Sequence, residues 1–229
     1  MALATFKDLC LDARDPVRLG EFWAAALDLE LQRHEDGDVH LSGPTPAHTV
    51  WVNRVPEPRT AKHRVHLDVN TASVAALERL GATVLDADSF RWTLMADPEG
   101  GEFCAFVREG EIERRLYEIG MDATGSVEDA HRVAAWWGEL TGGRVVDERG
   151  FSSVRDVPGA PFDSIDVAPV PEPKTAKNRV HLDLVAPDLA AVVATGATVL
   201  RPADDRVPWT VLADPVGNEL CLFPADPGA

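Results

Sequence analysis

The chain contains one stretch twice, and this repeat constrains the fold more than any other feature of the sequence. Residues 55–69 (VPEPRTAKHRVHLDV) recur as residues 170–184 (VPEPKTAKNRVHLDL), and the two windows agree at 12 of 15 positions. They begin 115 residues apart in a chain of 229 residues. Because that spacing is about half the chain, the sequence predicts two similar domains, residues 1–111 and 112–229.

Both copies end in the alternation typical of a half-buried β-strand. Arg64, His66 and Asp68 alternate with apolar residues, so these three polar side chains should share one face of a strand. Residues 179–183 repeat the pattern. The duplicated His-x-Asp is the first candidate for function, as a metal ligand or general base oriented by the carboxylate. The alternative is a buried Arg-His-Asp network that closes the sheet and binds nothing.

Each half also shows two copies of one succession: a strand, a helix and three strands. The first helix is predicted to begin at Asp15-Pro16, where a side-chain cap precedes a proline at the first helical position. Glycine and proline separate the strands that follow. The expected elements of the amino half are strands at 6–13, 31–34, 39–42, 49–55, 64–69, 82–85, 92–96 and 102–107, with a second helix at about 71–80.

The carboxyl half restarts this pattern after a charged stretch. Residues 108–115 (REGEIERR) lack strand periodicity and are expected to be a linker, and residues 116–123 repeat the pattern of 6–13. The last residues, 224–229, are expected to be a short tail. The sequence therefore predicts an α+β fold of four βαβββ units in two pairs.

Charge and cysteine content exclude several classes of function. The formal net charge of −16 argues against nucleic acid and anionic membranes as partners, since phosphate contacts need clustered Lys and Arg. Three cysteines without a CxxC spacing favour a reducing compartment. Residues 1–6 do not resemble a signal peptide, and no apolar run approaches the roughly 20 residues needed to span a bilayer. We expect a cytoplasmic protein that is a monomer or a homodimer.

The paired βαβββ units resemble the vicinal oxygen chelate superfamily, which comprises glyoxalases, bleomycin-resistance proteins and extradiol dioxygenases. The motifs that resemble its glyoxalase-like branch are Asp15-Pro16, Phe22-Trp23, residues 62–68 (KHRVHLD) and 97–104 (DPEGGEFC), with the last two repeated at 177–183 and 214–221. The resemblance implies two tandem paired-unit glyoxalase-like domains with cup-shaped mixed sheets. It also implies a small organic ligand in each cup.

In metal-using members of that superfamily, a divalent ion is held by the first and last strands of two paired units. The resemblance places the first-strand ligands of the amino half at Asp8 and His66, and those of the carboxyl half at Glu118 and His181. The usual last-strand Glu is replaced by Cys in this chain. The corresponding last-strand positions are about Asn53 and Cys104, and about Ala168 and Cys221.

Each of these groups has a second interpretation. Asp8 and Glu118 could be hard metal ligands, charges at the sheet ends, or salt-bridge partners of Arg64 and Arg179. A thiolate beside His could bind Zn²⁺, giving the triads Asp8-His66-Cys104 or Glu118-His181-Cys221, but a free cysteine more often packs as a small apolar residue. The tryptophans on strands could line a ligand pocket or pack a hairpin.

Two functions from different classes remain open. One is a metal-dependent lyase, isomerase or dioxygenase that uses Fe, Mn, Zn, Ni or Mg; the other is a ligand-binding or antibiotic-sequestering protein without a metal. Four residues are candidates for catalysis: His66, His181, Asp68 and Asp183. The candidate metal ligands are Asp8, His66, Glu118 and His181. The candidate pocket residues are Asp8, Asp12, Trp51, Asn53, Arg64, Trp92, Cys104, Glu118, Asp122, Arg179, Trp209 and Cys221.

Overall fold

The computed structural model describes residues 2–225 and follows the expected order of elements. The strands of the amino half are β1 (Thr5–Ala13), β2 (Glu30–Arg33), β3 (Val39–Ser42), β4 (Val50–Arg54), β5 (Val65–Thr71), β6 (Thr83–Asp86), β7 (Thr93–Ala96) and β8 (Glu102–Val107). Those of the carboxyl half are β9 (Leu116–Thr124), β10 (Arg144–Glu148), β11 (Phe151–Arg155), β12 (Ser164–Val170), β13 (Val180–Ala186), β14 (Thr198–Arg201), β15 (Thr210–Ala213) and β16 (Glu219–Pro224). The helices are α1 (Pro16–Leu27), α2 (Val74–Leu80), α3 (Val127–Thr141) and α4 (Leu189–Ala194).

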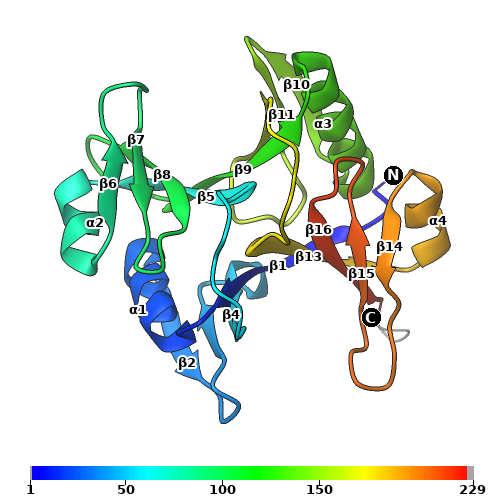
Figure 1. Ribbon diagram of the computed structural model, residues 1–229, viewed down its shortest axis with the longest axis horizontal. Coiled ribbons are helices and arrows are strands. Elements are labelled where there is room, and N and C mark those ends of the chain that lie inside the picture. Colours follow the sequence, from blue (N-terminus) through cyan, green and yellow to red (C-terminus); the bar gives the residue numbers. More distant parts are fainter. Residues whose placement is uncertain (1, 226–229) are drawn as a thin grey trace.

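Two mixed sheets of eight strands organise these elements, and neither sheet is closed. Sheet A has the order β14-β15-β16-β13-β1-β4-β3-β2, and sheet B has the order β10-β11-β12-β9-β5-β8-β7-β6. The predicted α+β class and its four βαβββ units are confirmed. Sheet A joins the first unit to the fourth, and sheet B joins the second to the third (Figure 1). Each sheet therefore takes one unit from each half of the chain.

The connections explain this pairing. The two repeated proline-rich segments carry the chain from one sheet to the other, from β4 to β5 and from β12 to β13. Residues 108–115 join β8 to β9 within sheet B, as expected of a linker. Because β9 pairs with β5, the fourth unit must return to the first, and β13 pairs antiparallel to β1.

Helix α1 begins where the sequence predicts a cap, and α3 begins at a cap of the same kind. Asp15 accepts a hydrogen bond from the backbone N–H of Arg18 at the start of α1, and Ser126 forms a capping box with Asp129 at the start of α3. The second helix begins at Val74 rather than near Thr71. The reason is that β5 continues to Thr71, and the side chain of Ser73 then caps the helix.

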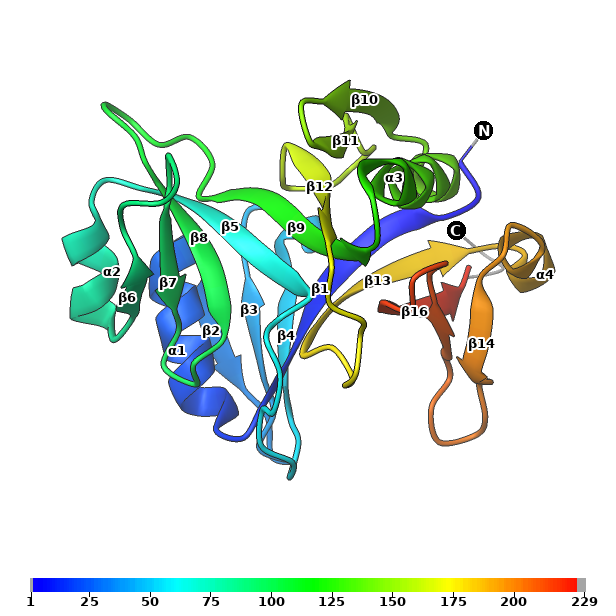
Figure 2. The same cartoon turned by 45° about the horizontal axis from the view of Figure 1, so that its top comes forward.

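One hydrophobic core joins the apolar faces of the two sheets through the helices. Trp23 on α1 packs edge-on against Phe103 of sheet B, with ring centroids 5.2 Å apart. Trp137 on α3 is fully buried and donates from Nε1 to Asp214 of sheet A at 3.2 Å. Figure 2 shows α1 and α2 at one end of the molecule and α3 and α4 at the other. The opposite, polar faces of the sheets are left to form the cups.

Within residues 2–225, no helix has the length and apolar character needed to cross a membrane. The expected tail begins inside β16, which continues to Pro224. Residues 226–229 of that tail lie outside the described residues.

Candidate binding cups

The centre of sheet A is the antiparallel pair β1 and β13. Asp8 lies opposite Asp183, and Cys10 lies opposite His181. On the other side of β13, Asp183 pairs in register with Cys221 of β16. Because alternate residues of a strand share a face, this register gathers two carboxylates, two thiols and one imidazole on the polar face.

These groups are in direct contact around His181. Its Nε2 atom lies 3.4 Å from Cys221 Sγ and 3.3 Å from Asp183 Oδ1. Cys10 Sγ lies 3.8 Å from Asp183 Oδ2 and accepts a hydrogen bond from Asn53 Nδ2 at 3.3 Å. Cys10, His181 and Asp183 each offer one metal-ligand atom, and the three atoms lie within 4.8 Å of one another.

Burial and like charge set the protonation of this group. Burial raises the pKa of Asp8 to about 6, with a further increase from Asp183, while Lys7 opposes the shift. Burial also raises the pKa of the Cys10 thiol to about 11. For His181, burial lowers the pKa, but the Cys10 sulfur and the Asp183 carboxylate together raise it well above its ordinary value. These surroundings therefore favour the protonated imidazole of His181 and the neutral thiol of Cys10.

Aromatic side chains form the walls of this cup. A cavity of about 440 Å³ opens above His181 and is lined by Trp51, Trp209 and Phe223. Trp209 and Phe223 stack with centroids 5.1 Å apart, and Lys7 Nζ lies 4.5 Å from the centre of the Phe223 ring. Cavities of this size and composition are typical of small-molecule sites.

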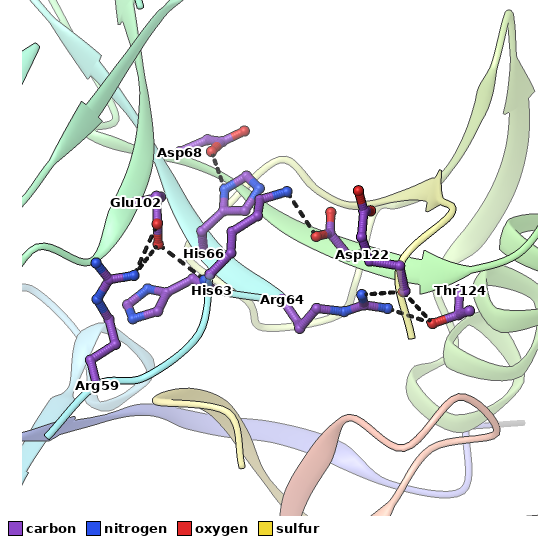
Figure 3. Close-up of polar contacts among 10 residues, drawn as sticks. Arg59, His63, Arg64, His66, Asp68, Glu102, Asp122 and Thr124 are labelled. Carbon is purple, nitrogen blue, oxygen red and sulfur yellow. Dashed lines mark hydrogen bonds and ion pairs between the residues drawn. The ribbon is translucent and has the colours of Figure 1, made fainter. Parts of the chain in front are cut away.

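Sheet B repeats the arrangement around β5 and β9. Asp68 lies opposite Glu118 on β9 and in register with Cys104 on β8. His66 lies opposite Gly120, and its Nδ1 atom is 2.7 Å from Asp68 Oδ1 (Figure 3). His66, Asp68 and Cys104 form the second group that could hold a metal ion among the described residues.

The carboxylates of sheet B shift one another's titration. Burial raises the pKa of Glu118 to about 7, with further increases from Asp166 and Asp68. Burial lowers the pKa of His66, but Asp68 outweighs this effect and the net shift is upward. A cavity of about 610 Å³ is lined by Glu118 together with Tyr117 and Ser164, but not by His66, Asp68 or Cys104.

The cross-half pairing corrects the expected residue groups. Asp8 belongs to the cup of His181, and Glu118 belongs to the cup of His66. The triads Asp8-His66-Cys104 and Glu118-His181-Cys221 are therefore wrong, because each joins residues of different sheets. The first-strand carboxylate and the His-x-Asp come together only across the two halves of the chain.

The arginines also differ from expectation. Arg64 and Arg179 form no salt bridge with Asp8 or Glu118; they bind backbone carbonyl groups of residues 172 and 57. They line a cavity between the proline-rich segments, not a cup. Asp8 instead pairs with Lys7 at 2.5 Å.

The remaining predicted pocket residues divide between the two sheets. Asp12, Trp51, Asn53, Trp209 and Cys221 line the cavity of sheet A. Trp92 lies just before β7 of sheet B. Its ring lies between those of Phe90 and Phe106, at centroid distances of 5.1 and 5.6 Å. Asp122 accepts from Lys62 Nζ at 3.0 Å.

Sequence reasoning missed several residues of the sheet A cup, among them Lys7, Lys177 and Phe223. The alternation of β16 could have identified Phe223, since it lies two residues after Cys221. Lys7 could not be found in this way, because a register shift between Phe6 and Asp8 interrupts the alternation of β1. Lys177 lies in the loop before β13, and its Nζ is 2.5 Å from Asp12 Oδ2.

Solved structures with the same fold were found at low sequence identity. Glyoxalase I from Zea mays matches with a TM-score of 0.65 and 11% identity, over 96% of this chain and 92% of that chain. A putative dioxygenase from Bacillus subtilis subsp. subtilis str. 168 matches with a TM-score of 0.64 and 15% identity, over 96% and 86%. At these identities the likeness establishes the fold alone. No curated protein sequence matches the chain.

The family itself is identified by the sequence. The glyoxalase-like domain model matches twice, over residues 8–106 and 119–223. Each match spans two consecutive βαβββ units, and together the two matches cover most of the chain. The chain belongs to the glyoxalase-like domain family.

Proposed function

We propose that the chain binds a small organic molecule in the cup of sheet A. The observation that carries this proposal is the cavity of about 440 Å³ with aromatic walls and a polar floor at His181. Four carboxylates line it, those of Asp12, Asp38, Asp183 and Glu219, against the two lysines Lys7 and Lys177. Asp12 and Glu219 are paired with Lys177 and Lys174, whereas Asp38 forms no ion pair among the described residues. The carboxylate of Asp38 favours a planar ligand that is cationic, or one that binds together with a cation.

Ligand binding can be tested with a matched pair of tryptophan variants. The probes are small planar cations and catechol, detected by ligand-observed NMR. Trp209→Ala should abolish binding, because it removes the ring that stacks on Phe223 in the cup. Trp92→Ala removes the equivalent ring of sheet B and should leave binding intact. Binding that survives Trp209→Ala, or that is lost only in Trp92→Ala, would contradict the proposal.

A divalent metal at the floor of this cup is a second candidate, carried by a separate observation. Cys10, His181 and Asp183 supply sulfur, nitrogen and oxygen donors within 4.8 Å of one another. Asp183 Oδ1 is buried, and among the described residues its one polar neighbour is His181 Nε2 at 3.3 Å, outside good hydrogen-bond geometry, so a cation could satisfy this oxygen. This donor set fits Zn²⁺, Ni²⁺ or Fe²⁺ better than Mg²⁺.

The bound metal would supply Lewis-acid polarisation of a substrate oxygen, the chemistry of lyase, isomerase or dioxygenase reactions. The protein's own residues would set its affinity. Since the pKa of Cys10 is raised to about 11, the thiol must lose its proton on binding, and metal affinity should rise with pH. Asp183 would hold the imidazole of His181 in place.

Metal content by mass spectrometry, followed by Co²⁺ titration with absorption spectra, tests this candidate. We expect a thiolate-to-metal absorption band that is lost in Cys10→Ser and His181→Ala and kept in the matched His66→Ala variant. No uptake of Zn²⁺, Ni²⁺, Fe²⁺ or Co²⁺ would exclude a metalloenzyme. The protein would then be a binding protein without chemistry.

The cellular setting belongs to the same proposal. Cys10, Cys104 and Cys221 are free and buried, which supports a reducing, cytoplasmic environment. Each cup takes one unit from each half of the same chain, so a second copy is not needed to complete it. This supports a monomer. Light scattering of the purified chain would distinguish a monomer from a homodimer.

A further inference from the structure

The two proline-rich loops, residues 56–64 and 171–179, enclose a cavity between the sheets. Its volume is about 540 Å³, and apart from Asp122 its lining comes entirely from the two loops. The loops are the longest repeated motif in the sequence, yet they contribute only Lys177 to the cup of sheet A. Their duplication therefore calls for its own explanation.

An arginine from each loop reaches across to the other loop. Arg64 donates from Nη1 to the carbonyl oxygen of Glu172 at 2.8 Å and from Nη2 to Thr124 Oγ1 at 2.7 Å (Figure 3). Arg179 donates from Nη2 to the carbonyl oxygen of Glu57. The two contacts are reciprocal, so both guanidinium groups lie where the loops face each other.

These two guanidinium groups lack the counterions that the neighbouring cations have. Four other cations of the loops are paired with carboxylates: Arg59 with Glu102, Lys62 with Asp122, Lys174 with Glu219 and Lys177 with Asp12. Among residues 2–225, neither Arg64 nor Arg179 forms an ion pair.

Each arginine also has a buried nitrogen to which the described residues offer no acceptor. These atoms are Arg64 Nε and Arg179 Nη1. Arg64 is only 8% exposed. A buried cationic donor without an anionic partner is costly. The cavity is thus lined by two guanidinium groups that form no ion pair, each with one buried nitrogen that no described residue satisfies.

We propose that the loop cavity binds a small dianion, either a phosphate group or a short dicarboxylate, between Arg64 and Arg179. Guanidinium groups bind both kinds of anion through paired N–H donors. The bound anion would hold the two loops together and so fix the spacing of sheets A and B. Glu57 and Glu172 are both exposed and would lie at the rim of the cavity, where their charges repel an entering anion. Salt screens this repulsion, so anions should enter more readily as the ionic strength rises.

Calorimetric titration of the whole chain tests the proposal, with sodium phosphate, sodium succinate and sodium chloride at matched ionic strength. We expect saturable binding of phosphate, succinate or both, which chloride does not reproduce. Binding of one alone would identify the ligand class. Equal heats from chloride, or no saturable binding, would overturn the proposal.

Variants locate the anion. Arg179→Gln should weaken binding at least about tenfold, because it removes a charged donor from a half-buried position. Arg179→Lys keeps the charge and should fall between Arg179→Gln and the unchanged chain. Arg206→Gln, in the exposed turn between β14 and β15, is the matched control and should bind normally.

A third variant separates this site from the cup of sheet A. If Lys7→Gln abolishes anion binding and Arg179→Gln does not, the anion binds in the cup and the loop proposal is wrong. Circular dichroism of each variant establishes that it is folded. The ligand proposed for the cup can fail its own test without affecting this result.

Discussion

The cups of sheets A and B share one strand register but differ in what surrounds their histidines. Cys10 lies opposite His181 in sheet A, whereas Gly120 lies opposite His66 in sheet B. A Cβ atom at Gly120 would lie 2.1 Å from His66 Cε1, so the His66 ring occupies the space that a side chain there would fill. His66 can therefore lie against β9 and bond Asp68, while His181 lies against two sulfur atoms.

A second difference concerns the neighbouring strand. Trp51 is in register with Cys10, and Asp166 occupies the equivalent place beside Gly120. Sheet A thus has an aromatic wall where sheet B has a third carboxylate near Asp68 and Glu118. The repeat retains its His-x-Asp and a Trp-Phe stack in both cups, but only sheet A adds Trp51 and a second thiol. The duplicated motif alone does not determine the chemistry of a cup.

The largest effect should come from giving sheet B the cysteine of sheet A. Gly120→Cys forces the His66 ring out of its place and breaks its bond to Asp68. Losing a charged hydrogen bond and leaving Asp68 buried should lower the free energy of unfolding by about 1–3 kcal/mol. Urea unfolding measures this change, and the NMR titration of His66 should shift toward the behaviour of an unpaired imidazole.

The reverse change is its control. Cys10→Gly removes a small side chain and the contact with Asn53, but no steric conflict arises. It should cost less than Gly120→Cys. If Gly120→Cys unfolds at the same urea concentration as the unchanged chain, the glycine does not determine the position of His66.

The carboxylates predict a pH dependence that differs between the cups. The pKa of Glu118 is raised from 4.5 to about 7 in the folded chain, so the folded state binds more protons than the unfolded state across that window. The free energy of unfolding must therefore fall as pH rises from 4.5 through 7. Asp8 has the same sign between 3.8 and about 6.

Removing these charges should stabilise the chain at alkaline pH. Glu118→Gln should raise the free energy of unfolding by about 1–2 kcal/mol at pH 8, a figure reduced for the partial exposure of Glu118, and should change little at pH 5. The effect of Asp8→Asn should be complete at a lower pH, since Lys7 opposes the rise in its pKa. Urea unfolding at several pH values measures both. A Glu118→Gln variant that is destabilised at pH 8 would show that the carboxylate is paired favourably.

The sequence predicts the units of this fold well and their pairing poorly. Strand alternation, helix caps and the repeat can be read directly from the chain, so β1, α1 and the proline-rich segments could be located from residues 6–13, Asp15 and the two repeated windows. Which unit hydrogen-bonds to which is decided by contacts far apart in the chain. Asp8 and Asp183 are opposite each other across 175 positions, and no local pattern reports that.

The same limit explains the errors at the candidate sites. The face of His66 and Asp68 follows from their alternation, but the residue that faces them from β9 depends on the register of two strands. A register shift at residues 6–8 then brings Lys7 to the cup, against the alternation. Arg64 lies at the end of the same alternation, yet its side chain is long enough to reach the opposite loop.

The smallest expected effect on the free energy of unfolding comes from replacing one loop lysine in each half. The two losses should be equal, which tests whether the loops contribute to the difference between the cups. Lys62 pairs with Asp122 of sheet B, and Lys177 pairs with Asp12 of sheet A. The lysine side chains are 58% and 56% exposed, while both carboxylates are buried. Exposed pairs contribute little, but a carboxylate left buried without its partner adds a cost.

Lys62→Met and Lys177→Met should each lower the free energy of unfolding by about 1 kcal/mol at neutral pH. Equal losses would show that the loops brace the two sheets alike, so that the cups differ through Cys10, Gly120 and their neighbours. A clearly larger loss for one lysine would locate part of the difference in the loops instead.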